Sequence, residues 1–544
     1  MEKWVGGFSA VTVTLAQNPS PAKPGTPFEK AWWLIFPPLL VALLLCHSLP
    51  AGVFAPGAAP VLLTNGITGS FFEGPSWDGA SNVFFTDGPN NRIYQWSDAG
   101  GLSVWMTNAA GPNGTYMASN GDLLVCQAGL KRVVRIAMNR IVTPVVNNYY
   151  GTNFNSCNDL WEAPDGGIYF TDPRWGPNGG LVYFVAPLST QAVRLATTNV
   201  IQPNGIIGTQ DGKTLYIDDD AGQKVYRYTM LPDGTVRNGA VFATVGRDGT
   251  TIDDQGNIYP CNWSASRINV FNEDGQQIDF VTLPYQCWNC TRYGAQLDTL
   301  FITAGSSPSR IYSMQLAPRL VYRQGIRGYQ HAGAMLAAAL PSNNFGAATT
   351  LLVGHSALSG GIVRAVYQFG LTNLAGSGSI TNAVLKLRAL ARQGTVTTLE
   401  LHRLTMAFTA GTGTWGQASG GVTWNSAADG VPWTPGGAYD AAPFARIALT
   451  GTLNHTPFYL SGPGLIAVVQ AAVSAGTPFG FLVRSADAES AGGENTVLLG
   501  SNNAEFQQDR PMLVLDEIPE PQVLLWLLAL GGALRTGYSA RACR

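Results

Sequence analysis

Charged side chains and histidines are both scarce in this 544-residue chain. Charged residues make up 12% of it, the formal net charge is −2, and no block of lysine or arginine occurs. The sequence therefore lacks the positive surface on which nucleic-acid binding depends. No histidine occurs between His47 and His331, which excludes a Ser-His-Asp triad and a His-based zinc site from this stretch. Catalysis or metal binding there must rely on carboxylates, amides and hydroxyls.

Long apolar runs are confined to the two ends of the sequence. Residues 31–45 (AWWLIFPPLLVALLL) are apolar but contain a Pro-Pro pair, and a membrane span needs about 20 apolar residues. Segment 1–52 is therefore predicted to be an export signal. Residues 519–521 (PEP), the apolar run 523–534 and three late arginines resemble the PEP-CTERM sorting tail of Gram-negative bacteria, here 518–544. We expect export to the periplasm, cell surface or extracellular matrix, with transient membrane contact through the terminal segments.

The residues that are abundant favour strands and tight turns. Glycine occurs 64 times and apolar residues make up 46% of the chain, which is enough to bury a large core. Few charges with many glycines and β-branched or aromatic residues are typical of sheets joined by short loops. The length indicates two or three domains. The predicted fold class is all-β.

One phrase returns about every 40 to 46 residues in the first half of the chain, which is the spacing of propeller blades. Each copy reads as a strand, a turn, an aliphatic-aromatic strand, a polar loop and a third strand. The copies are 77–96, 117–136, 162–185, 208–228, 251–271 and 293–314. Six copies predict a six-bladed β-propeller over residues 60–317.

An acid or amide residue stands just before the first strand of every copy. The six residues are Glu73, Asn113, Asn158, Asn204, Asp248 and Asn289. The repeat symmetry is expected to bring them to one mouth of the central channel. Calcium takes six to eight oxygen ligands and accepts carboxylates, amide carbonyls and water together, so the set is typical of a calcium site. Single members could instead form Asx turns.

Four motifs make the repeats similar to a known family. Residues 73–77 (EGPSW), 158–160 (NDL) ahead of 168–173 (IYFTDP), 203–205 (PNG) and 248–249 (DG) resemble the metal-binding motifs of gluconolactonases and regucalcin, the SMP type. The resemblance implies that Glu73, Asn158, Asn204 and Asp248 bind one divalent cation, usually calcium. It also implies that Asp248 acts as general base or nucleophile, and it places Asn113 in the substrate pocket. Asn289 is predicted there too.

The implied reaction is hydrolysis of a small-molecule lactone, in particular a sugar lactone. A bound cation polarises the carbonyl and stabilises the oxyanion, while a carboxylate takes a proton from water or attacks directly. Asp248 is the first candidate for this carboxylate and Asp159 the second. Both could instead orient the asparagine ligands.

The second half, 318–517, lacks the propeller phrase and has its own motifs. In order they are 364–369 (RAVYQF), 398–404 (TLELHRL), 411–415 (GTGTW), 422–425 (VTWN), 480–484 (GFLVR) and 510–515 (RPMLVL). They resemble the DNRLRE domain, a jelly-roll β-sandwich of secreted bacterial proteins, similar forms of which are associated with carbohydrate binding. A sandwich that holds an enzyme to a surface polysaccharide is one hypothesis. A non-catalytic surface or matrix protein with a metal-stabilised propeller is the alternative.

Five cysteines lie outside the terminal segments: Cys126, Cys157, Cys261, Cys287 and Cys290. An odd number cannot all pair. The spacing of Cys287 and Cys290 occurs once and has no histidine nearby, so a disulfide or buried thiols are favoured over a zinc site.

Overall fold

The computed structural model describes residues 52–516, except 175–178, 196, 198–199, 376–377 and 415–419. Nearly all of the predicted export signal and the whole predicted sorting tail therefore lie outside the described residues. Within the described part, strands dominate and only two α-helices occur, α1 (Pro463–Ala475) and α2 (Ala486–Ala491). The prediction of an all-β fold is confirmed. None of the described helices is long and apolar enough to cross a membrane.

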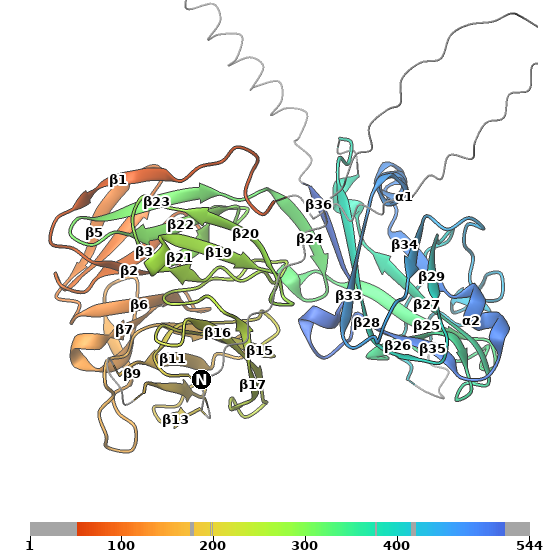
Figure 1. Cartoon of the computed structure of the whole chain (residues 1–544), viewed down its shortest axis with the longest axis horizontal. Helices are drawn as coiled ribbons and strands as arrows, with labels where there is room; N and C mark the ends of the chain where they lie inside the picture. Colours follow the sequence, from red (N-terminus) through yellow and green to blue (C-terminus); the bar gives the residue numbers. More distant parts are fainter. Residues whose placement is uncertain are drawn as a thin grey trace, which may run out of the picture. The chain divides into compact units, whose positions relative to one another are not determined.

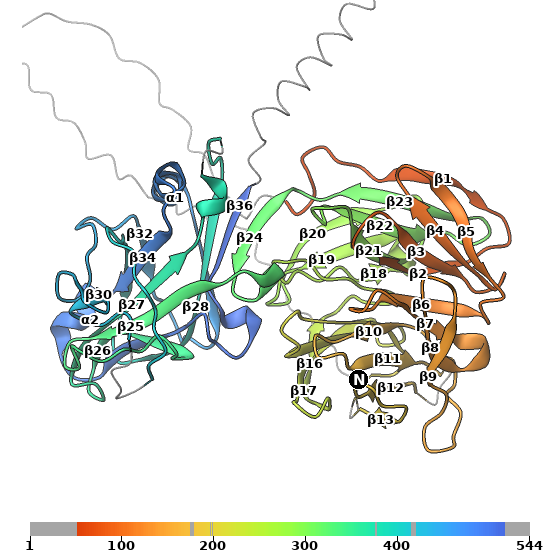
Figure 2. The same cartoon turned by 180° about the vertical axis from the view of Figure 1, so that it is seen from behind.

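Six separate antiparallel sheets form the blades of a propeller, as Figure 1 shows from one side and Figure 2 from the other. Blade 1 consists of β2 (Phe72–Trp77), β3 (Val83–Asp87), β4 (Arg92–Ser97) and β5 (Gly101–Thr107). Blade 2 consists of β6 (Pro112–Met117), β7 (Leu123–Gln127), β8 (Arg132–Ile136) and β9 (Val142–Val146). Blade 3 consists of β10 (Leu160–Glu162), β11 (Ile168–Asp172), β12 (Leu181–Val185) and β13 (Ala192–Arg194). Blade 4 consists of β14 (Pro203–Gly208), β15 (Thr214–Asp219), β16 (Lys224–Met230) and β17 (Val236–Ala243). Blade 5 consists of β18 (Cys261–Asn262), β19 (Arg267–Phe271) and β20 (Gln277–Thr282). Blade 6 consists of β21 (Cys287–Tyr293), β22 (Thr299–Ala304), β23 (Ser309–Gln315) and β1 (Val61–Ile67).

The first strand of the chain completes the last blade. β1 pairs antiparallel with β23, with Val61 opposite Ser313 and Leu62 opposite Tyr312. This pairing joins the start of the propeller to its end, so that the ring of sheets closes. Closure leaves each blade packed between two neighbours, which is how this architecture protects its sheets.

The second strand is buried along its whole length in four of the blades because it is covered on both faces. Every residue of β3, β7, β11 and β15 is buried. Continuous apolar runs, rather than alternating ones, are expected for strands packed on both sides. The turn before the second strand needs a left-handed residue in several blades, and Gly121 (φ 84°) and Gly166 (φ 88°) supply it. The repeat phrase in the sequence therefore has a direct structural cause.

The second region is a curled sheet with its own core. Eleven strands form it, in the order β24-β36-β28-β35-β26-β27-β34-β29-β32, with β25 on β27 and β33 on β28. Their bounds are β24 (Arg319–Arg323), β25 (His331–Ala337), β26 (Thr350–Ser356), β27 (Gly361–Phe369), β28 (Ala383–Gln393), β29 (Thr398–Arg403), β32 (Ala445–Ala448), β33 (Thr456–Ser461), β34 (Phe479–Arg484), β35 (Asn495–Gly500) and β36 (Met512–Asp516). A hairpin of β30 (Ser426–Ala428) and β31 (Val431–Pro432) stands apart, and 3-10 turns occur at Ala128–Leu130, Trp263–Ala265, Ile326–Gly328, Thr372–Leu374 and Gln507–Asp509.

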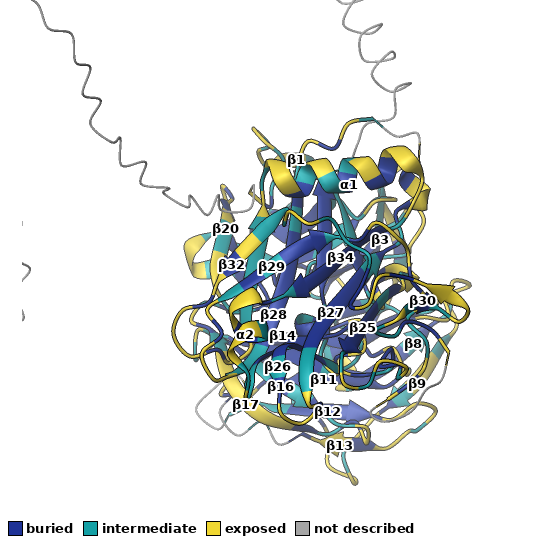
Figure 3. Cartoon of the chain, turned by 90° about the vertical axis from the view of Figure 1, so that its right-hand side faces the viewer, coloured by how far each residue is buried: buried dark blue, intermediate teal, exposed yellow. Residues whose placement is uncertain are grey.

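Figure 3 shows the burial of this second region, with β27 and β34 mostly buried and much of α1 exposed. The buried face of α1 consists of Leu465, Val469, Ala472 and Val473, which join the strand residues in one hydrophobic cluster. The predicted β-sandwich is thus one sheet that curls so that its apolar face encloses the hydrophobic core. The specific likeness to DNRLRE domains stays a prediction.

Candidate functional site

The first strands of the blades line the central channel, and the predicted ring residues lie where these strands begin. Glu73, Asn113 and Asn204 are the second residues of β2, β6 and β14. Asn158 lies just before β10. Backbone hydrogen bonds join one blade to the next here: the Gly114 amide donates to the Asn158 carbonyl at 2.7 Å, and the Gly205 amide to the Asp248 carbonyl at 3.2 Å.

The same bond pattern identifies the sixth ring position as Trp288. The Gly249 amide donates to the Trp288 carbonyl at 2.8 Å. Cys287 pairs with Ala304, as Phe72 pairs with Asp87 in blade 1, and the register then shifts between Cys287 and Asn289. The prediction that Asn289 is the sixth member of the ring is therefore wrong by one residue. The irregular start of β21 is the cause, because it moves the side-chain amide of Asn289 one position along the strand. The spacing of the repeats in the sequence does not reveal this shift.

A second layer lies one residue deeper and consists mainly of glycine. A Cβ added to Gly249 would lie 1.9 Å from Asn289 Cγ, and one added to Gly205 would lie 2.4 Å from the Asp248 carbonyl oxygen. The blades therefore approach too closely for side chains at these positions. Asp159 and Asn289 are the members that carry larger side chains. They meet, since Asn289 Nδ2 donates to Asp159 Oδ2 at 3.2 Å.

Three buried carboxyl groups interact at this place. Burial raises the pKa of Glu73 to about 8, and the neighbouring Asp159 charge adds to the rise. Burial raises the pKa of Asp159 to about 7. The pKa of Asp248 is raised well above its ordinary value by burial first and then by the charge of Glu73. The structure thus brings Glu73, Asp159 and Asp248 into one electrostatic cluster.

None of the ion pairs found among the described residues joins a lysine, arginine or histidine to these three carboxylates. An opposite charge nearby is what normally keeps a buried carboxyl ionised. The described part of the chain also contains no group of three His, Cys, Asp or Glu side chains arranged as a metal site. Asparagine carbonyls are also ligands, however, and two carboxylates combined with them suit a hard divalent cation. The residues Glu73, Asn158, Asn204 and Asp248 therefore fit such an ion chemically.

Hydrogen bonds from the second strands hold the ring backbone in place. The Thr86 hydroxyl donates to the Asn113 carbonyl at 2.7 Å, and the Thr171 hydroxyl donates to the Asn204 carbonyl at 2.7 Å. The side-chain nitrogen of Asn204 donates to the Arg247 carbonyl at 3.4 Å. This leaves the amide oxygen of Asn204 available as an acceptor or ligand.

Two cavities lie along the channel, and different residues of the same strands line them. The first, of about 370 Å³, is lined by Phe71, Glu73 and Asn113 and by residues that precede the ring positions. The second, of about 480 Å³, is lined by Asp159, Asn289 and residues that follow them. Of the two predicted pocket residues, Asn113 thus faces the first cavity and Asn289 the second.

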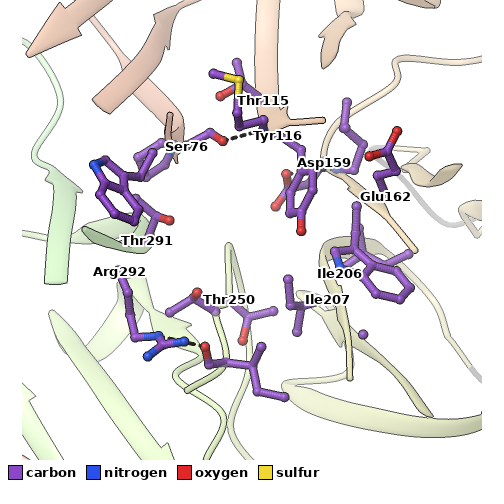
Figure 4. Close-up of a pocket in the computed structure, with 18 of the residues that line it drawn as sticks. Ser76, Thr115, Tyr116, Asp159, Glu162, Ile206, Ile207, Thr250, Thr291 and Arg292 are labelled. Atoms are coloured by element: carbon purple, nitrogen blue, oxygen red, sulfur yellow. Dashed lines mark hydrogen bonds between the residues drawn. The ribbon is translucent and has the colours of Figure 1, made fainter. Parts of the chain in front are cut away.

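Figure 4 shows the second cavity, where side chains of several blades surround an open centre. Ser76, Thr115 and Thr250 contribute hydroxyl groups, and Ile206 and Ile207 contribute apolar surface. Arg292 also lines it, but its guanidinium is engaged with Asp254 at 3.0 Å.

Trp288 is the site residue that the sequence interpretation missed. Its ring lies 4.9 Å from that of Phe71, which lines the first cavity, and its Nε1 donates to the Gly305 carbonyl at 2.9 Å. The sequence signal that could have identified it is the tryptophan between Cys287 and Cys290, directly before Asn289. Trp288 and Phe71 give this mouth an aromatic side.

Comparison with known proteins supports a relationship over the propeller. Residues 71–306 match the family described as SMP-30/Gluconolactonase/LRE-like region. A gluconolactonase of Zymomonas mobilis is 25% identical over 279 residues, which cover 44% of this chain and 77% of that protein. Lactonase drp35 of Staphylococcus aureus is 32% identical over 129 residues, which cover 22% of this chain and 39% of that protein.

Among solved structures, a gluconolactonase of Xanthomonas campestris is 26% identical, with a TM-score of 0.44 over 48% of this chain and 91% of that one. The family match spans the inner strands of all six blades, including the four motifs that carry the predicted ligands. The propeller of this chain is therefore similar to the SMP-30/gluconolactonase/LRE-like family, and the match lies in residues 71–306.

Proposed function

We propose that the propeller hydrolyses lactones at the ring mouth with a bound divalent cation, for which calcium is the first candidate. The observation that carries the proposal is the pair of buried carboxylates, Glu73 and Asp248. Burial raises the pKa of both, the charge of Glu73 adds to the rise at Asp248, and neither has a cationic partner among the described residues. The names of the related proteins, gluconolactonase and lactonase, support the reaction class.

Each ring residue has a defined part in this proposal. Glu73, Asn158, Asn204 and Asp248 would hold the cation, with two negative charges against its two positive ones. When bound, such an ion polarises a carbonyl and stabilises negative charge on its oxygen. Asn113 and the Phe71–Trp288 wall would position the lactone ring beside it. The first cavity is the volume in which the substrate would lie.

Asp248 is the proposed proton acceptor. Without the cation, burial and the charge of Glu73 raise its pKa. A bound cation would favour its ionised form, which is the form that accepts a proton. It would take a proton from water as the water oxygen attacks the lactone carbonyl. When the bond between the carbonyl carbon and the lactone ring oxygen breaks, Asp248 would pass this proton to that oxygen, which leaves as a hydroxyl group. Asp159 accepts a hydrogen bond from Asn289 Nδ2 at 3.2 Å in the deeper layer of glycine positions. This bond favours a role for Asp159 in orienting neighbouring groups.

Titration of released acid at constant pH tests the proposal with the full chain. A panel of sugar and aliphatic lactones would be measured after EDTA treatment and again after calcium is restored. We expect hydrolysis that EDTA abolishes and calcium restores. A folded protein that binds calcium but turns over none of the lactones would instead favour a non-catalytic surface protein. Export and surface attachment through the second region are separate proposals, tested by cell fractionation.

A further inference from the structure

All five described cysteines are buried and stand as free thiols in this structure, and they lie in two groups. Cys261, Cys287 and Cys290 belong to one hydrophobic cluster. There the Cys287 thiol donates to the Arg267 carbonyl at 3.1 Å and the Cys290 thiol to the Tyr259 carbonyl at 3.5 Å. Cys126 and Cys157 belong to one hydrophobic cluster, and their thiols interact electrostatically. None of the five is itself a ring residue, but Cys157 and Cys287 directly precede the ring residues Asn158 and Trp288.

A disulfide within the Cys287–Cys290 motif conflicts with the strand geometry. Both residues lie on β21, where each step advances about 3.3 Å. Three steps separate the two Cα atoms by about 10 Å, whereas a disulfide needs a Cα separation below about 7 Å. The cysteine that shares a hydrophobic cluster with both is Cys261, on β18 of the neighbouring blade.

The two groups occupy equivalent places in the propeller. In blade 5, which has three strands, β18 corresponds to the second strand of the other blades, because the segment before it pairs with it only through the bridge between Ile252 and Ile258. Cys126 pairs with Val133 in blade 2 as Cys261 pairs with Ile268 in blade 5, so both stand at the same position of this strand. Cys157 directly precedes the ring residue Asn158, as Cys287 directly precedes Trp288 in the next blade after Cys261.

The side chain at this second-strand position points toward the ring segment of the next blade. In blade 1 the equivalent residue is Thr86, whose hydroxyl reaches the Asn113 carbonyl at 2.7 Å. In blade 3 it is Thr171, whose hydroxyl reaches the Asn204 carbonyl at 2.7 Å. A cysteine at this position therefore faces the ring residue of the next blade and the residue that precedes it.

We propose that the propeller contains two equivalent inter-blade disulfides, Cys126–Cys157 and Cys261–Cys287, and that Cys290 remains a thiol. The assignment pairs four of the five cysteines and explains why the number is odd. Each bond closes a loop of about 30 residues, which stabilises the fold mainly by restricting the unfolded chain. Each bond also ties the segment entering the ring to the preceding blade.

Formation of each disulfide requires an external two-electron acceptor. Two cysteine thiols lose two protons and two electrons and form one S–S bond, while a small-molecule disulfide such as oxidised glutathione gains them and leaves as two thiols. Burial raises the pKa of the Cys126 and Cys261 thiols. The folded protein therefore exchanges slowly, and the bonds would form while the blades assemble.

Peptide mapping of the refolded full chain tests the assignment. The reduced, denatured protein is refolded in a glutathione redox buffer, the monomeric native fraction is collected, free thiols are alkylated, and trypsin digestion is done without reduction. Cleavage after Arg247, Arg267 and Arg292 places Cys261 in peptide 248–267 and Cys287 with Cys290 in peptide 268–292. We expect these two peptides to be joined, and 93–131 to be joined to 141–174.

Two variants distinguish the partners within the second group. Cys290→Ser is the matched control and should keep both cross-links. Cys287→Ser should lose only the cross-link between 248–267 and 268–292. Unlinked peptides from the native fraction, or a link that persists in Cys287→Ser through Cys290, would overturn the assignment.

The thermal midpoint gives an independent readout. Reduction with dithiothreitol should lower the midpoint of the wild type, and it should leave unchanged that of a Cys126→Ser, Cys261→Ser double variant. Equal effects of the reductant on both proteins would contradict the proposed bonds.

Discussion

Removal of the cation should make the stability of the propeller fall as the pH rises, because of Glu73. The carboxyl of Glu73 is buried at the ring, and its pKa is raised from 4.5 to about 8. Between these two values the folded protein binds a proton that the unfolded chain has lost. Since the folded state binds more protons, its free energy of unfolding decreases with increasing pH across this window. The contribution is fully present below about pH 4.5 and is lost as the pH passes about 8.

The size of the effect follows from the shift. One pKa unit corresponds to about 1.4 kcal/mol, so the shift of Glu73 from 4.5 to about 8 corresponds to a total loss of about 5 kcal/mol. Asp159, whose pKa is raised to about 7, acts in the same direction. A bound divalent cation favours the ionised form of Glu73 and lowers its pKa. Calcium should therefore remove most of this pH dependence.

Urea unfolding followed by tryptophan fluorescence measures the effect, at about pH 5 and about pH 8.5, with EDTA and with calcium. The Glu73→Gln variant, which cannot titrate there, is the control and should show a smaller loss than the wild type in EDTA. Equal pH dependence in the wild type and in Glu73→Gln would refute the electrostatic reasoning, and so would an unchanged slope after calcium is added.

Two further changes test the construction of the ring. Thr171→Val removes the hydroxyl that holds the Asn204 carbonyl at 2.7 Å; we expect a loss of about 1 kcal/mol of stability and weaker calcium binding by calorimetry, and unchanged affinity would speak against Asn204 as a ligand. Gly249→Ala places a Cβ 1.9 Å from Asn289 Cγ, so thermal unfolding should show a loss of about 1–3 kcal/mol. Gly370→Ala, where a Cβ meets nothing within 4 Å, is its control, and an equal effect in both variants would contradict the tight second layer.

The sequence contained enough information to predict the blades, because each one repeats the same turn and the same buried second strand. It did not reveal that β1 completes blade 6. Residues Val61–Ile67 lack the repeat phrase, and their pairing with β23 depends on closure of the whole ring. Pairings between the two ends of a repeat array are set by the tertiary fold rather than by local pattern.

The ring was predicted from spacing, and the spacing failed where a strand is irregular. In blade 6 the shift between Cys287 and Asn289 moves the amide one layer deeper and puts Trp288 at the ring. The contact between Asn289 and Asp159 joins residues of opposite blades, so no local signal could announce it. Residue type identified the chemistry of the site, while the register of each strand decided which side chains meet.

The most direct test of the proposed site compares lactone hydrolysis by the wild type with that of Asp248→Asn, both saturated with calcium. Asp233→Asn is the control, since Asp233 is exposed and bonds only to Thr235 among the described residues. The account predicts that Asp248→Asn loses turnover by at least about a hundredfold, while Asp233→Asn keeps the wild-type rate. Wild-type turnover in a correctly folded Asp248→Asn protein would contradict the assignment of the reaction to this ring.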